Sequence, residues 1–118
     1  MLIAEVGLNY LGDEKLAMKY VEKLATMEVD GITFQVPEER FFQNPKNKYL
    51  KLRTECILDV LHYTKSLGVK FGVAISNVNL VEKFKNYETD FYKVLSTHIS
   101  EEVLIKELVN NTNKQIFN

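Results

Sequence analysis

The chain has 118 residues, of which 46% are hydrophobic and 26% are charged, and its formal net charge at pH 7 is -1. This size and composition are typical of one globular domain and exclude a long disordered chain. Because the charges nearly balance and lysine and arginine form no run, the sequence gives no long-range attraction to phosphate backbones, and we expect no nucleic acid partner.

The single cysteine, Cys56, has no partner for an intramolecular disulfide, which is typical of an intracellular protein. No apolar stretch reaches the ~20 residues that cross a bilayer. The opening residues MLIAEVGLNYLGDE lack the cationic region and the cleavage site of a signal peptide. We therefore expect a cytoplasmic protein without membrane contact.

Apolar runs of strand length alternate along the chain with longer stretches of helical periodicity. The first strand is expected within residues 1–8, and the first helix over 13–27 with Asp13 as its N-cap. A polar loop from Pro37 to Tyr49 precedes a helix through residues 52–67 that ends at Gly68. Further strands are expected at 31–36, 70–75, 91–96 and 115–117, and further helices at 77–87 and at 100–111, the last with Ser100 as its cap.

Alternating strands and helices predict a parallel sheet, because right-handed crossovers return the chain to the same edge of the sheet. We expect residues 1–118 to form a single α/β domain, a (βα)4β half of a TIM-type barrel. The alternative is a flavodoxin-like doubly wound sheet, such as a receiver domain. The positions where a receiver carries its acidic residues and its lysine hold other residue types here.

The expected strands each have two different faces. Alternate side chains point to opposite faces of a sheet, and in a β/α barrel the apolar set faces the helices. The other set faces the lumen, where ligands bind near the carboxyl ends of the strands. The apolar set is Ile32, Phe34, Val36, Phe71, Val73, Ile75, Tyr92 and Val94, and the other includes Thr33, Gln35, Gly72, Ala74 and Lys93.

Three polar side chains, Glu5, Gln35 and Lys93, are expected to converge on the lumen side. A buried carboxylate and a buried ammonium are costly unless they are paired, so their presence on strands requires an explanation. One interpretation is a structural ion pair between Glu5 and Lys93. The other is a site for an anionic, hydroxylated ligand, with Lys93 as a phosphate or carboxylate contact and Glu5 as an acid/base or hydroxyl acceptor.

The first four expected strands lie in the segments AEVGLNYLGDEKLA, ITFQV, SLGVKFGVAIS and DFYKVLS. In the same order, these segments resemble the N-terminal strand motifs of the sialic acid (N-acetylneuraminate) synthase family and its relatives that make other nonulosonic acids. The first and fourth segments are the most similar. The resemblance implies the N-terminal half of the family's β/α barrel.

The family condenses phosphoenolpyruvate with an N-acetylated amino sugar in a metal-dependent reaction, so the resemblance implies a transferase of carbohydrate biosynthesis. It places Glu5 at the family's first-strand active-site carboxylate and Asn9 at its first-turn asparagine. The resemblance also implies that Gln35 contacts the sugar or the phosphate, and that Lys93 and Ser96 contact phosphoenolpyruvate. The implied metal is manganese or magnesium.

The sequence also departs from the family at several positions. Thr33 stands in place of a lysine, Tyr10 in place of a histidine and His98 in place of a glutamate, while Ala74 and Ile75 replace a threonine and a proline. The family's metal-binding histidines belong to the second half of its barrel, and its antifreeze-protein-like domain follows the barrel. We therefore expect no metal ligands and no such domain in these residues, and no catalysis by this chain alone.

Several other residues have a structural and a functional interpretation. His98 is expected to be a solvated loop histidine rather than an acid/base, and His62 a surface residue rather than a zinc ligand. Cys56 is expected to be a small core residue. The loop Pro37 to Tyr49 is either a lid over a ligand or, through Phe41 and Phe42, a segment that packs on a strand or on a second chain.

Two functional alternatives stay open beside the synthase. The half barrel is either a non-catalytic binding or assembly module or a truncated fragment of a full-length synthase. Because a half barrel leaves its sheet edges unpaired, we also expect a homodimer.

Overall fold

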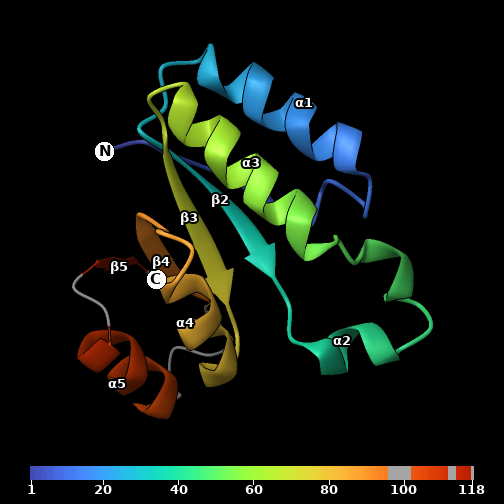
Figure 1. Cartoon of the computed structure of the whole chain (residues 1–118), viewed down its shortest axis with the longest axis vertical. Coiled ribbons are helices and arrows are strands. Elements are labelled where there is room, and N and C mark those ends of the chain that lie inside the picture. Colours follow the sequence, from blue (N-terminus) through green and yellow to red (C-terminus); the bar gives the residue numbers. More distant parts are fainter. Residues whose placement is uncertain (96–101, 112–113, 118) are drawn as a thin grey trace.

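The computed structural model of the chain describes residues 1–95, 102–111 and 114–117. Within these residues, five parallel strands form one sheet in the order β1-β2-β3-β4-β5. The sheet is open, so the predicted partial α/β barrel fold is confirmed (Figure 1). The strands are β1 (Ile3–Gly7), β2 (Gly31–Val36), β3 (Lys70–Ile75), β4 (Phe91–Val94) and β5 (Gln115–Phe117), and the α-helices are α1 (Glu14–Ala25), α2 (Glu39–Gln43), α3 (Thr54–Ser66), α4 (Val78–Lys85) and α5 (Glu102–Asn111).

The strand order excludes the flavodoxin-like alternative. A doubly wound sheet reverses its strand order at a switch point and carries helices on both faces. Here each strand pairs with the next one along the chain. The buried side chains of α1, α3, α4 and α5 join one cluster with the apolar side chains of the strands, so these helices cover the same face of the sheet.

Local capping signals set the ends of several helices. The Asp13 side chain accepts hydrogen bonds from the backbone N–H groups of Lys15, at 2.9 Å, and Leu16, at 3.1 Å, which confirms Asp13 as the N-cap of α1. Asn77 caps α4 in the same way and accepts from the N–H of Asn79 at 2.8 Å. After α3 the chain turns through Gly68, whose φ of +78° favours glycine.

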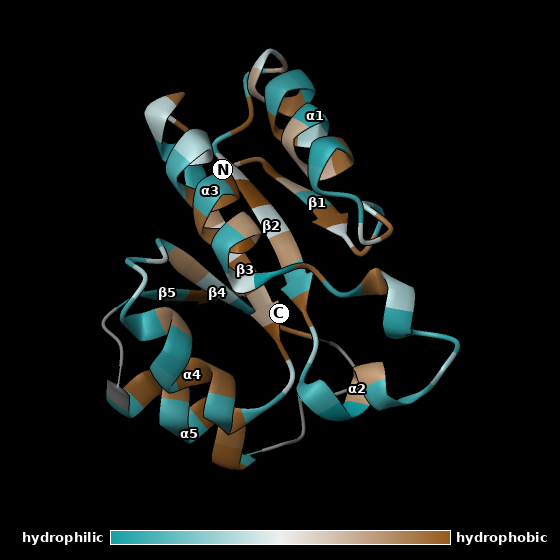
Figure 2. Cartoon of the chain, turned by 45° about the vertical axis from the view of Figure 1, so that its right-hand side comes forward, coloured by the Kyte–Doolittle hydropathy of each residue, from teal (hydrophilic) through white to brown (hydrophobic). Residues whose placement is uncertain are grey.

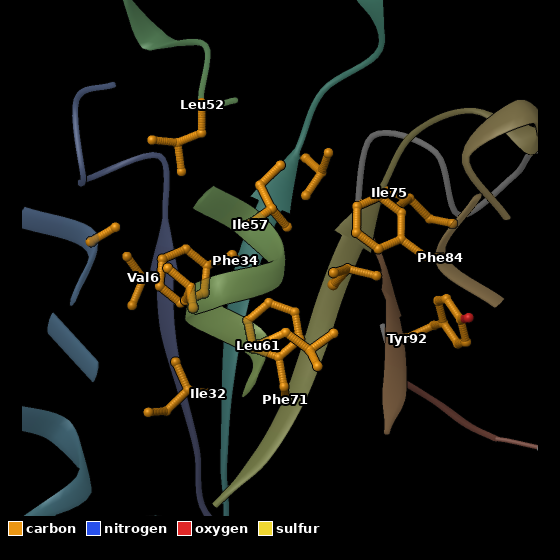
Figure 3. Packing of buried hydrophobic residues seen from close by; sticks show 14 of the residues in the cluster. Val6, Ile32, Phe34, Leu52, Ile57, Leu61, Phe71, Ile75, Phe84 and Tyr92 are labelled. Carbon is orange, nitrogen blue, oxygen red and sulfur yellow. The ribbon is translucent and has the colours of Figure 1, made fainter. Parts of the chain in front are cut away.

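The hydrophobic core lies between the sheet and its helices (Figure 3). Phe34 of β2 and Phe71 of β3 stack with ring centroids 5.7 Å apart, and Leu61 of α3 and Phe84 of α4 pack in the same cluster. Ile32 is fully buried with them. The helices mix hydrophilic and hydrophobic residues along their length, as expected of helices that bury one face (Figure 2). The assignment of the apolar strand residues to the helix side is therefore confirmed.

The segment after β2 differs from the predicted loop. The helix α2 and a short 3-10 helix η1 (Lys48–Leu50) occupy most of residues 37–50. The Asn47 side chain donates a hydrogen bond to the carbonyl of Phe41 at 3.2 Å and joins the two elements. Helices of five and three residues are too short to produce a periodic pattern in the sequence.

Three expected positions, Ser96, His98 and Ser100, lie outside the described residues. His62 is exposed and Cys56 is buried, as predicted. In the part of the chain that the structure describes, no helix has the length and apolar character needed to cross a membrane.

Candidate functional site

The face of the sheet opposite the helices carries the small and polar set of strand residues. We call it the inner face and define it by Glu5, Thr33, Gln35, Gly72, Ala74, Phe91 and Lys93. Gln35 of β2, Ala74 of β3 and Lys93 of β4 lie at the same level in adjacent strands. Two strand spacings separate the backbones of Gln35 and Lys93, about 10 Å. Ala74 lies between them and is buried.

An ion pair joins Glu5 of β1 to Lys93 of β4 on the inner face. In a flat sheet three strand spacings, about 14 Å, would separate these two strands. The pair forms because the sheet curls, as in a barrel, and brings its first and fourth strands toward each other. The Lys93 side chain is 21% exposed and that of Glu5 is 58% exposed, so the pair lies at an open surface and solvent screens it.

The remaining predicted site residues lie at different places. Gln35 is half-buried on the inner face, and its backbone carbonyl accepts a hydrogen bond from the Tyr10 hydroxyl at 3.2 Å. Asn9 is exposed in the turn after β1. The structure thus brings Glu5 and Lys93 together, places Gln35 level with Lys93, and leaves Asn9 in a loop.

Thr33 and Tyr10, which depart from the family pattern, have structural partners. Thr33 is buried, and its hydroxyl donates to the carbonyl of Ala4 in the adjacent strand at 3.3 Å. Tyr10 packs its ring on Phe34, with the centroids 5.9 Å apart. Burial, with a smaller contribution from Cys56, raises the pKa of Tyr10 to about 12. The hydroxyl therefore stays protonated at neutral pH and supports packing rather than proton transfer.

The inner face also holds Phe91, which the sequence reading did not include. Its side chain is only 2% exposed, and its ring lies over the places that Cβ atoms of Gly31 and Gly72 would occupy. Phe117 of β5 meets it edge-on, with ring centroids 5.5 Å apart. Alternation with Lys93, two residues later in β4, would have placed Phe91 on this face. In register, Phe117 lies level with Lys93 and Phe91 lies level with Glu5, so the aromatic pair lies beside the Glu5 to Lys93 pair on the inner face.

The described residues do not form a metal site. Within 1–95, 102–111 and 114–117, no three His, Cys, Asp or Glu side chains gather closely enough to hold an ion. Glu5 is a carboxylate on the inner face, but its contact there is the ammonium of Lys93. These side chains do not fit the divalent metal that the resemblance implies, and we assign no step to a metal in this chain.

Comparison with known proteins shows similarity at the level of structure. No protein-family model matches the chain, and no curated protein matches its sequence. The N-acetylneuraminic acid (sialic acid) synthetase of Leptospira borgpetersenii, solved in complex with citrate, superposes on 93% of this chain with a TM-score of 0.83 and 24% identity. Spore coat polysaccharide biosynthesis protein E of Chromobacterium violaceum superposes on 98% of this chain with a TM-score of 0.84 and 14% identity. The corresponding protein of Bacillus subtilis superposes on 99% of this chain with a TM-score of 0.82 and 22% identity.

The chain spans between 35% and 41% of the length of these three solved structures. Identities below one quarter establish the shared fold and not a shared activity. The resemblance to sialic acid synthases inferred from the sequence is thereby confirmed as a partial match in fold: the chain is an open α/β sheet of the kind found in these sugar-biosynthesis proteins.

Proposed function

We propose that the chain is part of a sialic acid synthase-like barrel and that its inner face binds the anionic end of phosphoenolpyruvate. The observation that carries the proposal is the Glu5 to Lys93 pair, which holds an ammonium and a carboxylate side by side on the inner face, with the Glu5 side chain 58% exposed. Lys93 is proposed to bind the phosphate or carboxylate of the substrate. Glu5 is proposed to accept a hydrogen bond from a hydroxyl group of the amino sugar, or a proton from it.

The ammonium group of Lys93 has hydrogen-bond donors available for a ligand anion. A lysine ammonium has three N–H donors and the carboxylate of Glu5 accepts from it, so donors remain for a ligand anion. Because Glu5 already compensates the charge of Lys93, we expect weak binding of the anion by this chain alone. The chain spans 41% of the length of the Leptospira synthetase, and we propose that the other contacts come from sequence beyond these 118 residues.

The test is calorimetric titration of the purified chain with phosphoenolpyruvate, with and without manganese. We expect saturable binding with a dissociation constant of about 1 mM. Lys93→Ala should weaken it about tenfold or more, since a charge-assisted hydrogen bond is lost. Lys70→Ala is the matched control. Lys70 is exposed at the amino-terminal end of β3, away from the level of Lys93, and its side chain has the same strand parity as Gly72 and Ala74.

Equal binding by the wild-type chain and the Lys93→Ala variant would contradict the proposed role of Lys93. Absence of binding at millimolar phosphoenolpyruvate would show that the inner face of this segment does not hold the ligand. Loss of binding in both lysine variants would indicate a nonspecific charge effect instead of a site at β4.

A second candidate function is assembly, and the open sheet favours it. Among the described strands, β1 and β5 form the two edges of the sheet. Their outer backbone groups can pair with another chain, and a second copy is the proposed partner. Light scattering coupled to gel filtration should give twice the mass of one chain across a wide range of concentrations. A monomer mass throughout that range would rule out the assembly role.

A further inference from the structure

A pocket of about 130 Å³ opens on the helix side of the sheet, away from the inner face. Residues of α2, α4, the start of α3 and the carboxyl end of β2 line it, and Figure 1 shows α2 and the start of α3 near the end of β2. The pocket shares no lining residue with the Glu5 to Lys93 pair. It is therefore separate from the proposed substrate site.

The floor of this pocket is apolar. Val36, Leu52 and Ile57 line it and are each at least nine-tenths buried, and Leu80 of α4 joins them. Leu52 and Ile57 belong to the hydrophobic cluster of the core (Figure 3). An apolar body placed here would continue the packing of the core.

The rim of the pocket carries two lysines in different electrostatic states. Lys51 forms an ion pair with Glu39, which also lines the pocket, so these two charges compensate each other. Lys83 is half-buried, and its ammonium contacts the hydroxyl of Thr54 at 3.4 Å. No carboxylate in the described part of the chain forms an ion pair with Lys83.

We propose that this pocket binds a small monocarboxylate with an aromatic or branched apolar body. The ligand carboxylate would accept hydrogen bonds from the Lys83 ammonium and the Thr54 hydroxyl, both of which line the pocket. The apolar body would lie on Leu52 and Ile57. A closed cavity of about 150 Å³ holds benzene, and this pocket of about 130 Å³ is open on one side, so it suits an aromatic ring whose carboxylate stays at the rim.

The neighbouring charges favour a single negative charge on the ligand. Lys83 supplies one uncompensated positive charge at the rim, and Glu39 presents a carboxylate whose charge Lys51 already balances. A second negative group on the ligand would approach Glu39 without a free cation to receive it. Phosphates and dicarboxylates should therefore bind less well than a monocarboxylate.

Benzoate is the probe, and its neutral isostere benzamide is the matched ligand control. By ligand-observed NMR and calorimetry we expect saturable benzoate binding with a dissociation constant of about 1 mM, and benzamide binding about tenfold weaker. Lys83→Met keeps the aliphatic stem but removes the charge, and should weaken benzoate binding about tenfold. Lys85→Met, the same change at an exposed position of α4 that does not line the pocket, should leave it unchanged.

Absence of saturable benzoate binding would overturn the proposal, and so would equal binding of benzoate and benzamide or an unchanged affinity in Lys83→Met. Thermal melting of both lysine variants checks that they are folded. Lys83→Met should also leave the phosphoenolpyruvate titration unaltered. Failure of this pocket to bind can therefore be distinguished from failure of the inner face.

Discussion

A Gly72→Val variant is expected to lose about 3 kcal/mol or more of its free energy of unfolding, because the new side chain would overlap the ring of Phe91. A Cβ at Gly72 would fall on three carbons of that ring. The ring cannot turn aside easily, since it is 2% exposed and also contacts the Phe117 ring. Strand β3 lies between β2 and β4 and is held on both sides, so its backbone cannot move away. Urea unfolding followed by circular dichroism measures the loss.

A double-mutant cycle with Phe91→Ala separates this clash from a general preference for glycine. If the ring is the cause, the two substitutions together should destabilise the chain by clearly less than the sum of their separate effects. Additive losses would mean that the Phe91 ring is not what requires glycine at position 72.

Phe71→Ala is expected to cost about 3 to 5 kcal/mol, since it removes a large side chain from the centre of the core and leaves a cavity. Phe71 is fully buried on the helix side of β3 and stacks on Phe34 with an interplanar angle of 23°. A loss of this size is a large part of the stability of an ordinary domain, so this variant should unfold at a much lower urea concentration.

Phe41→Ala in α2 is the matched control, because Phe41 is only half-buried and its ring contacts its neighbour Phe42. It should cost about 1 kcal/mol. Equal losses at the two positions would contradict the assignment of Phe71 to the main core. The same urea titration measures both variants.

The strands were the most predictable part of the fold. The bounds of β2, β3 and β5 are those expected from the sequence, because turn residues at both ends of a short apolar run define where the strand begins and ends. The parity of Phe34 and Phe71 correctly predicted which side the helices cover. Residues 37–50 could not be predicted in the same way, since α2 and η1 depend on contacts such as that between Asn47 and Phe41.

In the candidate site, only the strand face on which each side chain lies could be predicted, from the alternation of side chains along the strands. Alternation placed Glu5 and Lys93 on one face, and the curl of the sheet then brought them into contact. Phe91 has the same parity as Lys93, but only the structure shows that its ring lies over Gly31 and Gly72. The Lys83 pocket is formed by segments that are distant in sequence, and no local pattern indicates it.

From β2 through β5, each strand of this sheet pairs with the strand that precedes it in the chain. During synthesis, β2 can therefore dock on β1 as soon as it leaves the ribosome, without waiting for a distant partner. Each loop closure joins strands that are consecutive in the chain, and the longest of these connections, between β2 and β3, holds only α2, η1 and α3, which keeps the entropic cost of each step small. A nascent chain of this topology can grow its sheet in the order of translation, and at each stage the next strand covers the edge that the last strand left exposed, while β1 keeps the opposite edge.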